Sequence, residues 1–565
     1  MNQRPELRQF VEPDDGVHGR VPGARSDASA RPVLPDLSAG PSCQSCAGEA
    51  KAAPRHWFDA NPQGFTRAQR EHTTLLFGGL TQSQDILIGG ALEGLGYKVR
   101  VLDTPDNDAL RFGKEFGNRG QCNPTYFTVG NLIKYLRDLE GKGLSRQEII
   151  DNYVFTTVGA CGPCRFGTYA TEYRKALRDA GYTGFRVLLL DNNGGLRQAC
   201  GDDVGLVLDR VFIFALIKAV MIGDILNVMA YRMRPYEVTP GATDQAVEAC
   251  RKILREALSS GRNSLRAMRR CRTVLDTVEL DWMRAKPKVS IIGEFWAMTT
   301  EGDGCYHLQR FLEQEGAEVD GQMVMAWVMY QVWQNRWDTR RRMMLRKSDH
   351  ARMGLGDKDE RKRLVQLWIA EKALKAAFHT YAWAIGLRHA RLPDMDEMAE
   401  LSNRFYDNHI RGGEGHMEVG KLIQTALYRK AHMVISIKPF GCMPSSGISD
   451  GIQSQVSELY PDAVFCAVET TGDAAVLLHS RVQMQLFKAR EMARSEFARA
   501  CEETGLDADE ARLRLKRAGL NSVSGYRWRK RTAATAVAQL HAVSGGWMKR
   551  PLAATRRLLQ TQPIS

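Results

Sequence analysis

The stretch Val158-Gly-Ala-Cys-Gly-Pro-Cys-Arg-Phe-Gly-Thr-Tyr169 places two cysteines in a tight Gly/Pro turn. The β-branched and aromatic run Tyr153–Val158 before it predicts a buried strand, and helical spacing of small and apolar residues predicts a helix over Thr168–Ala180. Cys161 and Cys164 therefore follow the carboxyl end of a strand, where open α/β sheets bind ligands. The first amides of the next helix favour thiolate over thiol. This setting suits a metal or cluster; a buried pair of structural thiols and a thioredoxin-type redox pair are the alternatives.

The same alternation of strands and helices occurs twice along the chain. Short apolar runs predict strands in the first part at 74–77, 98–103, 153–158 and 185–190, and in the second part at 288–292, 318–320, 433–438 and 464–468. Strands that alternate with helices favour a parallel sheet covered by helices. We therefore predict an α/β fold with two flavodoxin-like (Rossmann-like) halves. The first turn, Gly78-Gly79, lacks the G-x-G-x-x-G fingerprint of dinucleotide-binding proteins.

Composition shifts divide the chain of 565 residues into five predicted segments. These are a disordered or linker segment (1–70), the first α/β half (71–205), a helical insertion (206–286), the second half with a long helical insert (287–500) and a basic tail (501–565). The first segment is rich in Pro, Gly, Ser, Arg and Asp, which cannot build a core. We expect it, and the tail beyond about residue 510, to be peripheral.

Charge and cysteine content narrow the class of protein. The chain is 44% hydrophobic and 25% charged, as in ordinary globular proteins. Its 12 cysteines are too few for a disulfide scaffold, and no secretory leader opens the sequence, so we expect a cytoplasmic protein. Much of the net charge of +13 follows Arg512, which is typical of a solvated appendage rather than of a nucleic-acid reader. The apolar run Phe212–Val228 is interrupted by charged residues and predicts a buried core helix, not a membrane span.

Two further cysteines occupy Gly-rich loops of the predicted sheets. Cys122 lies in the loop 117–127, and Cys442 follows the strand 433–438. Soft thiolates select zinc or iron–sulfur clusters, so we predict that a metal centre is shared between the halves by Cys122, Cys161 or Cys164, and Cys442. Their spacing matches no compact zinc-finger or ferredoxin motif. We interpret the other cysteines as a flexible dithiol (Cys43, Cys46) or as ordinary buried thiols (Cys200, Cys250, Cys271, Cys305, Cys466, Cys501).

Other candidates for chemistry are carboxylates and one arginine near these loops. Glu294, Glu414 and Glu469 lie at strand ends or in Gly-rich turns, where a carboxylate serves as an acid or base, or caps a helix. Arg165, beside the cysteine turn, is placed to pair with a phosphate or thiolate, or with a local carbonyl. Ser445 and Ser446 are predicted to be helix N-caps.

Several of these motifs, in the same order, give the chain a family resemblance. They are Gly-Gln-Cys122-Asn-Pro-Thr, Gly-Ala-Cys161-Gly-Pro-Cys164-Arg-Phe-Gly, Gly413-Glu-Gly415, Ile-Lys-Pro-Phe-Gly-Cys442-Met-Pro-Ser-Ser-Gly and Glu469-Thr-Thr-Gly-Asp. Over residues 73 to about 495 the chain resembles the 2-hydroxyacyl-CoA dehydratase family, in particular the component found in large proteins labelled CoA-substrate-specific enzyme activase. The resemblance implies a [4Fe–4S] cluster held by cysteines between two flavodoxin-like halves. It also implies an ATP-dependent activase as electron donor, an acyl-CoA substrate dehydrated by a radical route, and paired subunits, as a homo- or heterodimer.

The chain departs from this family in one respect. The activase has an actin-like nucleotide fold, and its phosphate-binding signatures are absent from this sequence, so the activase is expected to be a separate partner. Two alternatives stay open at this point: an ATP-driven reductase of a small molecule other than acyl-CoA, and a non-enzymatic zinc or iron–sulfur scaffold.

Overall fold

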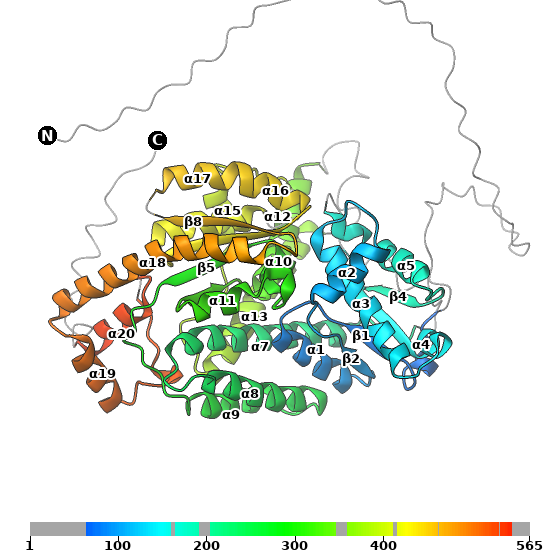
Figure 1. The fold of residues 1–565 in the computed structure, drawn as a ribbon, viewed down its shortest axis with the longest axis horizontal. Helices are drawn as coiled ribbons and strands as arrows, with labels where there is room; N and C mark the ends of the chain where they lie inside the picture. Colours follow the sequence, from blue (N-terminus) through cyan, green and yellow to red (C-terminus); the bar gives the residue numbers. More distant parts are fainter. Residues whose placement is uncertain are drawn as a thin grey trace, which may run out of the picture. The chain divides into compact units, whose positions relative to one another are not determined.

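The computed structural model describes residues 64–159, 164–190, 204–345, 359–410, 415–461, 463–529 and 532–544. Figure 1 shows these residues as helices surrounding two separate sheets. The predicted α/β fold is confirmed.

The first sheet has four parallel strands in the order β2-β1-β3-β4. They are β1 (Thr74–Phe77), β2 (Val99–Val101), β3 (Tyr153–Val158) and β4 (Arg186–Leu190). The helices of this half are α1 (Gln82–Gly94), α2 (Asn107–Phe116), α3 (Asn123–Gly141), α4 (Arg146–Asn152) and α5 (Tyr169–Asp179).

The second sheet repeats this pattern, with parallel strands in the order β6-β5-β7-β8. They are β5 (Lys288–Gly293), β6 (Glu318–Gly321), β7 (Met433–Pro439) and β8 (Val464–Thr470). Its helices include α10 (Phe295–Thr299), α11 (Leu308–Gln314), α15 (Gly415–Tyr428), α16 (Met443–Gly447), α17 (Gln453–Leu459) and α18 (Ala475–Thr504). The two identical strand orders establish two flavodoxin-like halves.

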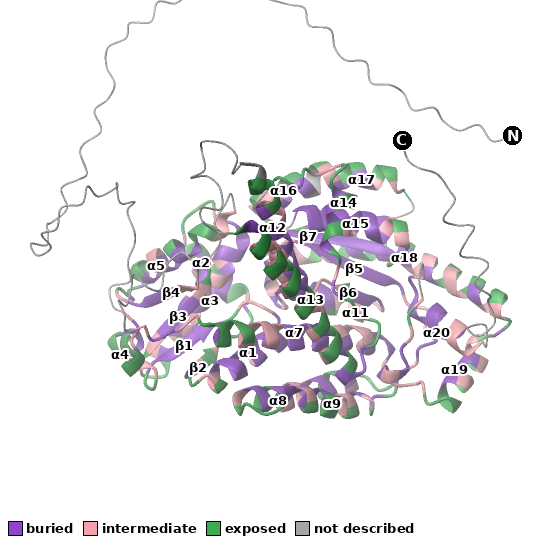
Figure 2. Ribbon diagram, turned by 180° about the vertical axis from the view of Figure 1, so that it is seen from behind, coloured by how far each residue is buried: buried purple, intermediate pink, exposed green. Residues whose placement is uncertain are grey.

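Burial on both faces explains why the strands are continuously apolar. Every residue of β7 is buried, as Figure 2 shows for the sheet interior. Successive side chains point to opposite faces, so Ile435 joins the core cluster that contains residues of α11 and α18, whereas Val434 joins the cluster that contains residues of α15 and α17. Such strands give no alternating pattern, but their short β-branched runs still predict them.

Helical segments connect and extend the halves. They are α7 (Arg210–Met233), α8 (Ala242–Ser259), α9 (Ser264–Leu275), α12 (Val324–Leu345), α13 (Glu360–Ile385) and α14 (Met395–Ser402). The segment Arg210–Tyr236 is long and apolar enough to cross a membrane by length and composition, but more than half of its most apolar window is buried inside the protein. It forms the core helix that the sequence predicted. Asp224 of α7 accepts hydrogen bonds from the Gln84 side chain of α1 (2.8 Å) and from the backbone N–H of Met325 in α12 (2.7 Å).

The C-terminal region contributes to the core as far as residue 543. Two helices, α19 (Ala508–Arg517) and α20 (Thr535–Val543), bury Leu515 and Leu540 in the largest core cluster. Glu496 of α18 accepts backbone hydrogen bonds just before α20 begins. The prediction that the chain beyond about 510 is peripheral is therefore wrong for these helices. The prediction failed because the many Arg and Lys residues of this region dominate its composition, although the short segment Thr535–Val543 is apolar.

The loop Glu301–His307, which we call the capping loop, joins the second half to the first. The Glu301 carboxylate accepts the backbone N–H of Gln82 (2.7 Å), and Asp303 accepts that of Asn107 (2.8 Å). These two amides begin α1 and α2, whose first N–H groups have no partner within the helix. Carboxylates are favoured there by the helix dipole as well.

The same loop also accepts hydrogen bonds from backbone N–H groups just before α18. The Tyr306 hydroxyl accepts hydrogen bonds from the backbone N–H groups of Thr471 (2.8 Å), Gly472 (2.8 Å) and Ala474 (3.3 Å). Tyr306 and His307, at the end of this loop, have positive φ angles of 56° and 52°. This conformation is uncommon for residues other than glycine.

Candidate functional site

The candidate site lies where the carboxyl ends of the central strands face the boundary between the halves. In both sheets the strand order reverses around the first strand, so the switch points fall between β1 and β3 and between β5 and β7. Ligands of open α/β sheets bind at such points. Glu294 follows β5, and its N–H donates to the Ile437 carbonyl of β7 (2.9 Å), shortly before Cys442. Cys161 and Cys164 follow β3.

The loops that carry Cys122 and Cys442 touch each other. The backbone N–H of Asn123 donates to the Phe440 carbonyl (3.0 Å), and the Asn123 side chain donates to the Thr470 carbonyl (3.1 Å). Gly441, at φ +79°, packs so closely that a Cβ atom there would lie 3.2 Å from the Cα of Cys122. The structure thus brings the loops of two predicted ligands, one from each half, into contact.

Two hydroxyl groups surround the sulfur of Cys122. Cys122 is buried and is the N-cap residue of α3, with Pro124 in the first turn. Its Sγ lies 3.0 Å from the Tyr169 hydroxyl and 3.2 Å from the Thr125 hydroxyl. Burial, together with the adjacent Cys122 thiol and the charge of Glu294, raises the pKa of Tyr169 well above its usual value. The phenol therefore keeps its proton.

Two glutamate side chains, Glu294 and Glu418, lie near Cys442 instead. Cys442 is buried and is the N-cap residue of α16. Burial and then the charge of Glu294 raise the pKa of the Cys442 thiol; Glu418 raises it further, and hydrogen bonding to Ser445 opposes the rise. The Ser445 hydroxyl donates to Glu418 Oε1 (3.2 Å). A bound cation would reverse this balance, because a coordinated thiol loses its proton.

The other two predicted cysteine ligands are only partly defined. Cys161 lies outside the described residues. Cys164 is partly buried and precedes a short 3₁₀ helix (Arg165–Thr168) that leads directly into α5, the helix of Tyr169. Within the ranges that the structure describes, no three His, Cys, Asp or Glu side chains group as a metal site, and that search does not include Cys161.

The three predicted carboxylates have different settings. Glu294 is partly buried; its Oε2 accepts the N–H of Ala297 (2.8 Å) and caps α10, and burial raises its pKa. Glu469 belongs to β8 rather than to the loop after it, is exposed, and lies 3.9 Å from Lys438. Glu414 lies outside the described residues. Only Glu294 is thus placed beside the cysteine loops by the described geometry.

The predicted role of Arg165 stays open, whereas the predicted role of Ser445 and Ser446 is wrong. Arg165 is partly buried, and its backbone carbonyl accepts the Thr168 hydroxyl (2.8 Å); no carboxylate in the described part of the chain pairs with its guanidinium. The prediction that Ser445 and Ser446 are N-caps is wrong. The N-cap of this helix is Cys442, about one turn earlier. The Ser446 hydroxyl donates a hydrogen bond to the Cys442 carbonyl (2.6 Å).

Two residues of this site, Glu418 and Tyr169, were missed by the sequence analysis. Glu418 is 2% exposed, and its Oε2 has no hydrogen-bond partner among the described residues. Burial raises its pKa to about 7, with Glu294 adding to the rise and Lys438 opposing it. A glutamate on an apolar helix face was the available signal for Glu418. Tyr169 gave no signal, because its contact with Cys122 depends on how α3 and α5 pack.

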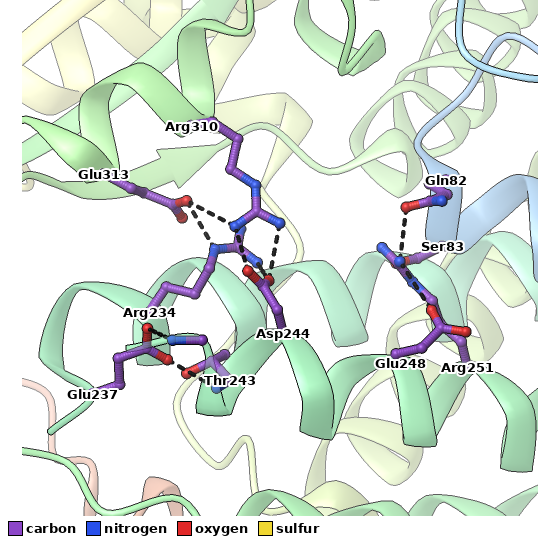
Figure 3. Close-up of polar contacts among 11 residues, drawn as sticks. Gln82, Ser83, Arg234, Glu237, Thr243, Asp244, Glu248, Arg251, Arg310 and Glu313 are labelled. Atoms are coloured by element: carbon purple, nitrogen blue, oxygen red, sulfur yellow. Dashed lines mark hydrogen bonds and ion pairs between the residues drawn. The ribbon is translucent and has the colours of Figure 1, made fainter. Parts of the chain in front are cut away.

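A cavity of about 390 Å³ lies elsewhere, between the first half, α7, α8 and the capping loop. Three arginines line it, and all are paired. Figure 3 shows Arg310 bound to both oxygens of Asp244 (2.9 and 3.0 Å) and Arg234 bound to Glu313 (2.8 Å). Arg251 donates to Gln82 and Ser83 (2.8 and 3.0 Å). Because carboxylates balance this positive charge, the lining does not select an anionic ligand.

Neither the models of known protein families nor the curated proteins include a match to this chain.

Proposed function

We propose that this protein is an iron–sulfur protein of the 2-hydroxyacyl-CoA dehydratase type. Cys122, Cys442 and the Cys161/Cys164 turn would hold the cluster, and a separate ATP-dependent activase would supply low-potential electrons. The observation that supports this proposal is the direct contact between the loops of Cys122 and Cys442, one from each half, at the switch points of the two sheets.

The chemistry of the described residues fits such a group. Soft thiolates prefer iron–sulfur clusters or zinc, and both cysteines are shielded from water. A [4Fe–4S] cluster, when bound, supplies one-electron transfer at low potential. Hydroxyl groups at 3.0 and 3.2 Å from the Cys122 sulfur stabilise the negative charge of a coordinating thiolate.

The carboxyl groups near Cys442 suit the proton transfer that a dehydration needs. A hydroxyl leaves as water only after it gains a proton. The Glu418 side chain, with its pKa near 7, can both hold and release a proton at neutral pH, and Ser445 connects it to the Cys442 loop. Glu294, on the adjacent strand end, is a second carboxyl group that can hold or accept a proton. We assign these two residues the acid and base roles.

Anaerobic purification followed by iron, sulfide and zinc analysis tests the proposal. We expect about four iron and four sulfide per cluster and a visible spectrum that bleaches on reduction. Zinc without sulfide, in a colourless protein, would contradict it and support the scaffold alternative. Assays with the activase, comparing CoA thioesters with small reducible molecules, then separate dehydratase from reductase.

A further inference from the structure

The contact between Tyr169 and Cys122 has a defined direction. The Tyr169 hydroxyl lies 3.0 Å from the Cys122 sulfur, and the side chain is 7% exposed. A tyrosine phenol carries its proton at neutral pH, so it has a hydrogen to donate. When Cys122 is a thiolate, its sulfur can only accept, so the phenol must donate.

The position of Tyr169 is fixed by packing rather than by a mobile loop. It is the first residue of α5, and its ring packs edge-on against Phe166, with the ring centroids 5.0 Å apart. The second donor, Thr125, belongs to the first turn of α3, next to Cys122 itself. The two hydroxyls therefore reach one sulfur from two helices.

We propose that the Tyr169 hydroxyl donates a hydrogen bond to the Cys122 thiolate and raises the reduction potential of the group that this sulfur binds. The inference rests on the proposed function. A hydrogen bond to a ligand sulfur stabilises the added negative charge of the reduced state, and such bonds are among the factors that set cluster potentials.

The test is an anaerobic redox titration of the full-length holoprotein carrying Tyr169→Phe. We expect iron and sulfide content to match the unmodified protein and the potential to become more negative by about 59 mV, which is a tenfold change in the oxidised-to-reduced ratio for one electron. Thr125→Val, which removes the other donor, should shift the potential in the same direction. The matched control is Tyr173→Phe: Tyr173 is also buried in α5, but its ring packs at a tilt against Phe155 (ring centroids 4.7 Å apart), and we expect no shift.

Each outcome decides a different point. A full cluster with an unchanged potential in Tyr169→Phe would overturn the inference and leave the proposed function intact. Loss of iron from Tyr169→Phe but not from Tyr173→Phe would also overturn it, because the hydroxyl would then hold the ligand in place instead of setting the potential. If Tyr169→Phe does not fold, Thr125→Val alone decides in the same way. An unmodified protein without iron and sulfide would instead overturn the proposed function.

Discussion

At the scale of single residues, Cys442 is the position that tests a site shared between halves. Cys442→Ser keeps the size of the side chain but replaces a soft ligand with a poor one. We expect iron affinity to fall by at least about tenfold, the loss that follows removal of even an outer-sphere partner, and activase-dependent electron uptake to stop. The fold should persist, because the core clusters of the two sheets are distinct. Iron analysis measures the loss of iron, and circular dichroism checks that the fold persists.

Cys501→Ser is the matched control for this substitution. Cys501 is partly buried in α18 and lies in neither cysteine loop. A Cys442→Ser protein with a full cluster, an unaltered spectrum and normal reduction would show that Cys442 is a structural thiol and that the cluster belongs to the first half.

Glu418 predicts a pH dependence of stability. Its pKa is about 7 in the folded protein against an ordinary value of 4.5. Between these values the folded state holds a proton that the unfolded state has released, so the free energy of unfolding falls as pH rises from 4.5 to 7 and then levels. Glu418→Gln should remove a penalty of up to about 3 kcal/mol at pH 8 and have little effect at pH 4. Denaturant unfolding across this pH range measures it.

An exposed glutamate of a neighbouring helix supplies the control. Glu458→Gln in α17 makes the same charge change without burial and should leave the pH profile unaltered. If Glu418→Gln and Glu458→Gln gave the same profile, the proposed burial effect at Glu418 would be wrong.

These residues show what sequence could and could not predict about the site. That the loops of Cys122 and Cys442 meet was predictable, because each is a Gly-rich loop beside a recognisable strand or helix; their role as ligands stays a prediction. Glu418 and Tyr169 were not predictable, since their roles depend on which helices pack beside those loops. The prediction that Ser445 and Ser446 are N-caps failed for a local reason. Cys442 is the N-cap, so both serines lie inside the helix.

At the scale of elements, the capping loop predicts a stability contribution from one hydroxyl. Tyr306→Phe removes the acceptor for three backbone N–H groups at the start of α18 and keeps the ring. Leaving such donors without partners costs about 1–3 kcal/mol. We expect a loss of that order in the free energy of unfolding, and faster hydrogen exchange at the amides of Thr471 and Gly472.

Tyr182→Phe is the corresponding control. The Tyr182 hydroxyl is buried, and no backbone N–H of the described residues donates to it, so its removal leaves no backbone donor unpaired and should be close to neutral. Equal destabilisation by both substitutions would mean that the hydroxyl of Tyr306 does not hold the start of α18.

At this scale too, local patterns in the sequence predicted some elements, whereas contacts between distant segments were not predictable. All eight strands in the described part of the chain were predicted, because buried parallel strands are short apolar runs bounded by turns. The capping loop was not, because its partners are the first residues of helices distant in sequence. Helix α20 was missed because Arg and Lys residues on either side dominate the local composition.

At the scale of the whole molecule, the core begins before residue 70. Phe65 is 1% exposed and belongs to the largest core cluster, and its carbonyl accepts the N–H of Gly205 (2.6 Å). The predicted boundary at residue 70 is therefore too late. A chain that begins at Gly64 keeps every described core residue.

The C-terminal end gives the sharpest test of which residues belong to the molecule's core. A chain that ends at Thr504 loses α19 and α20, and with them Leu515 and Leu540, each worth about 1.5–3 kcal/mol of burial. It also leaves Glu318 and Glu496 without partners from residues 533–535. Since the total stability of a domain is about 5–15 kcal/mol, we expect this chain to unfold or aggregate. A chain that ends at Ser544 should match the full-length protein in melting temperature and iron content. Soluble, folded protein from the shorter chain would show that α19 and α20 only cover a core that is complete without them.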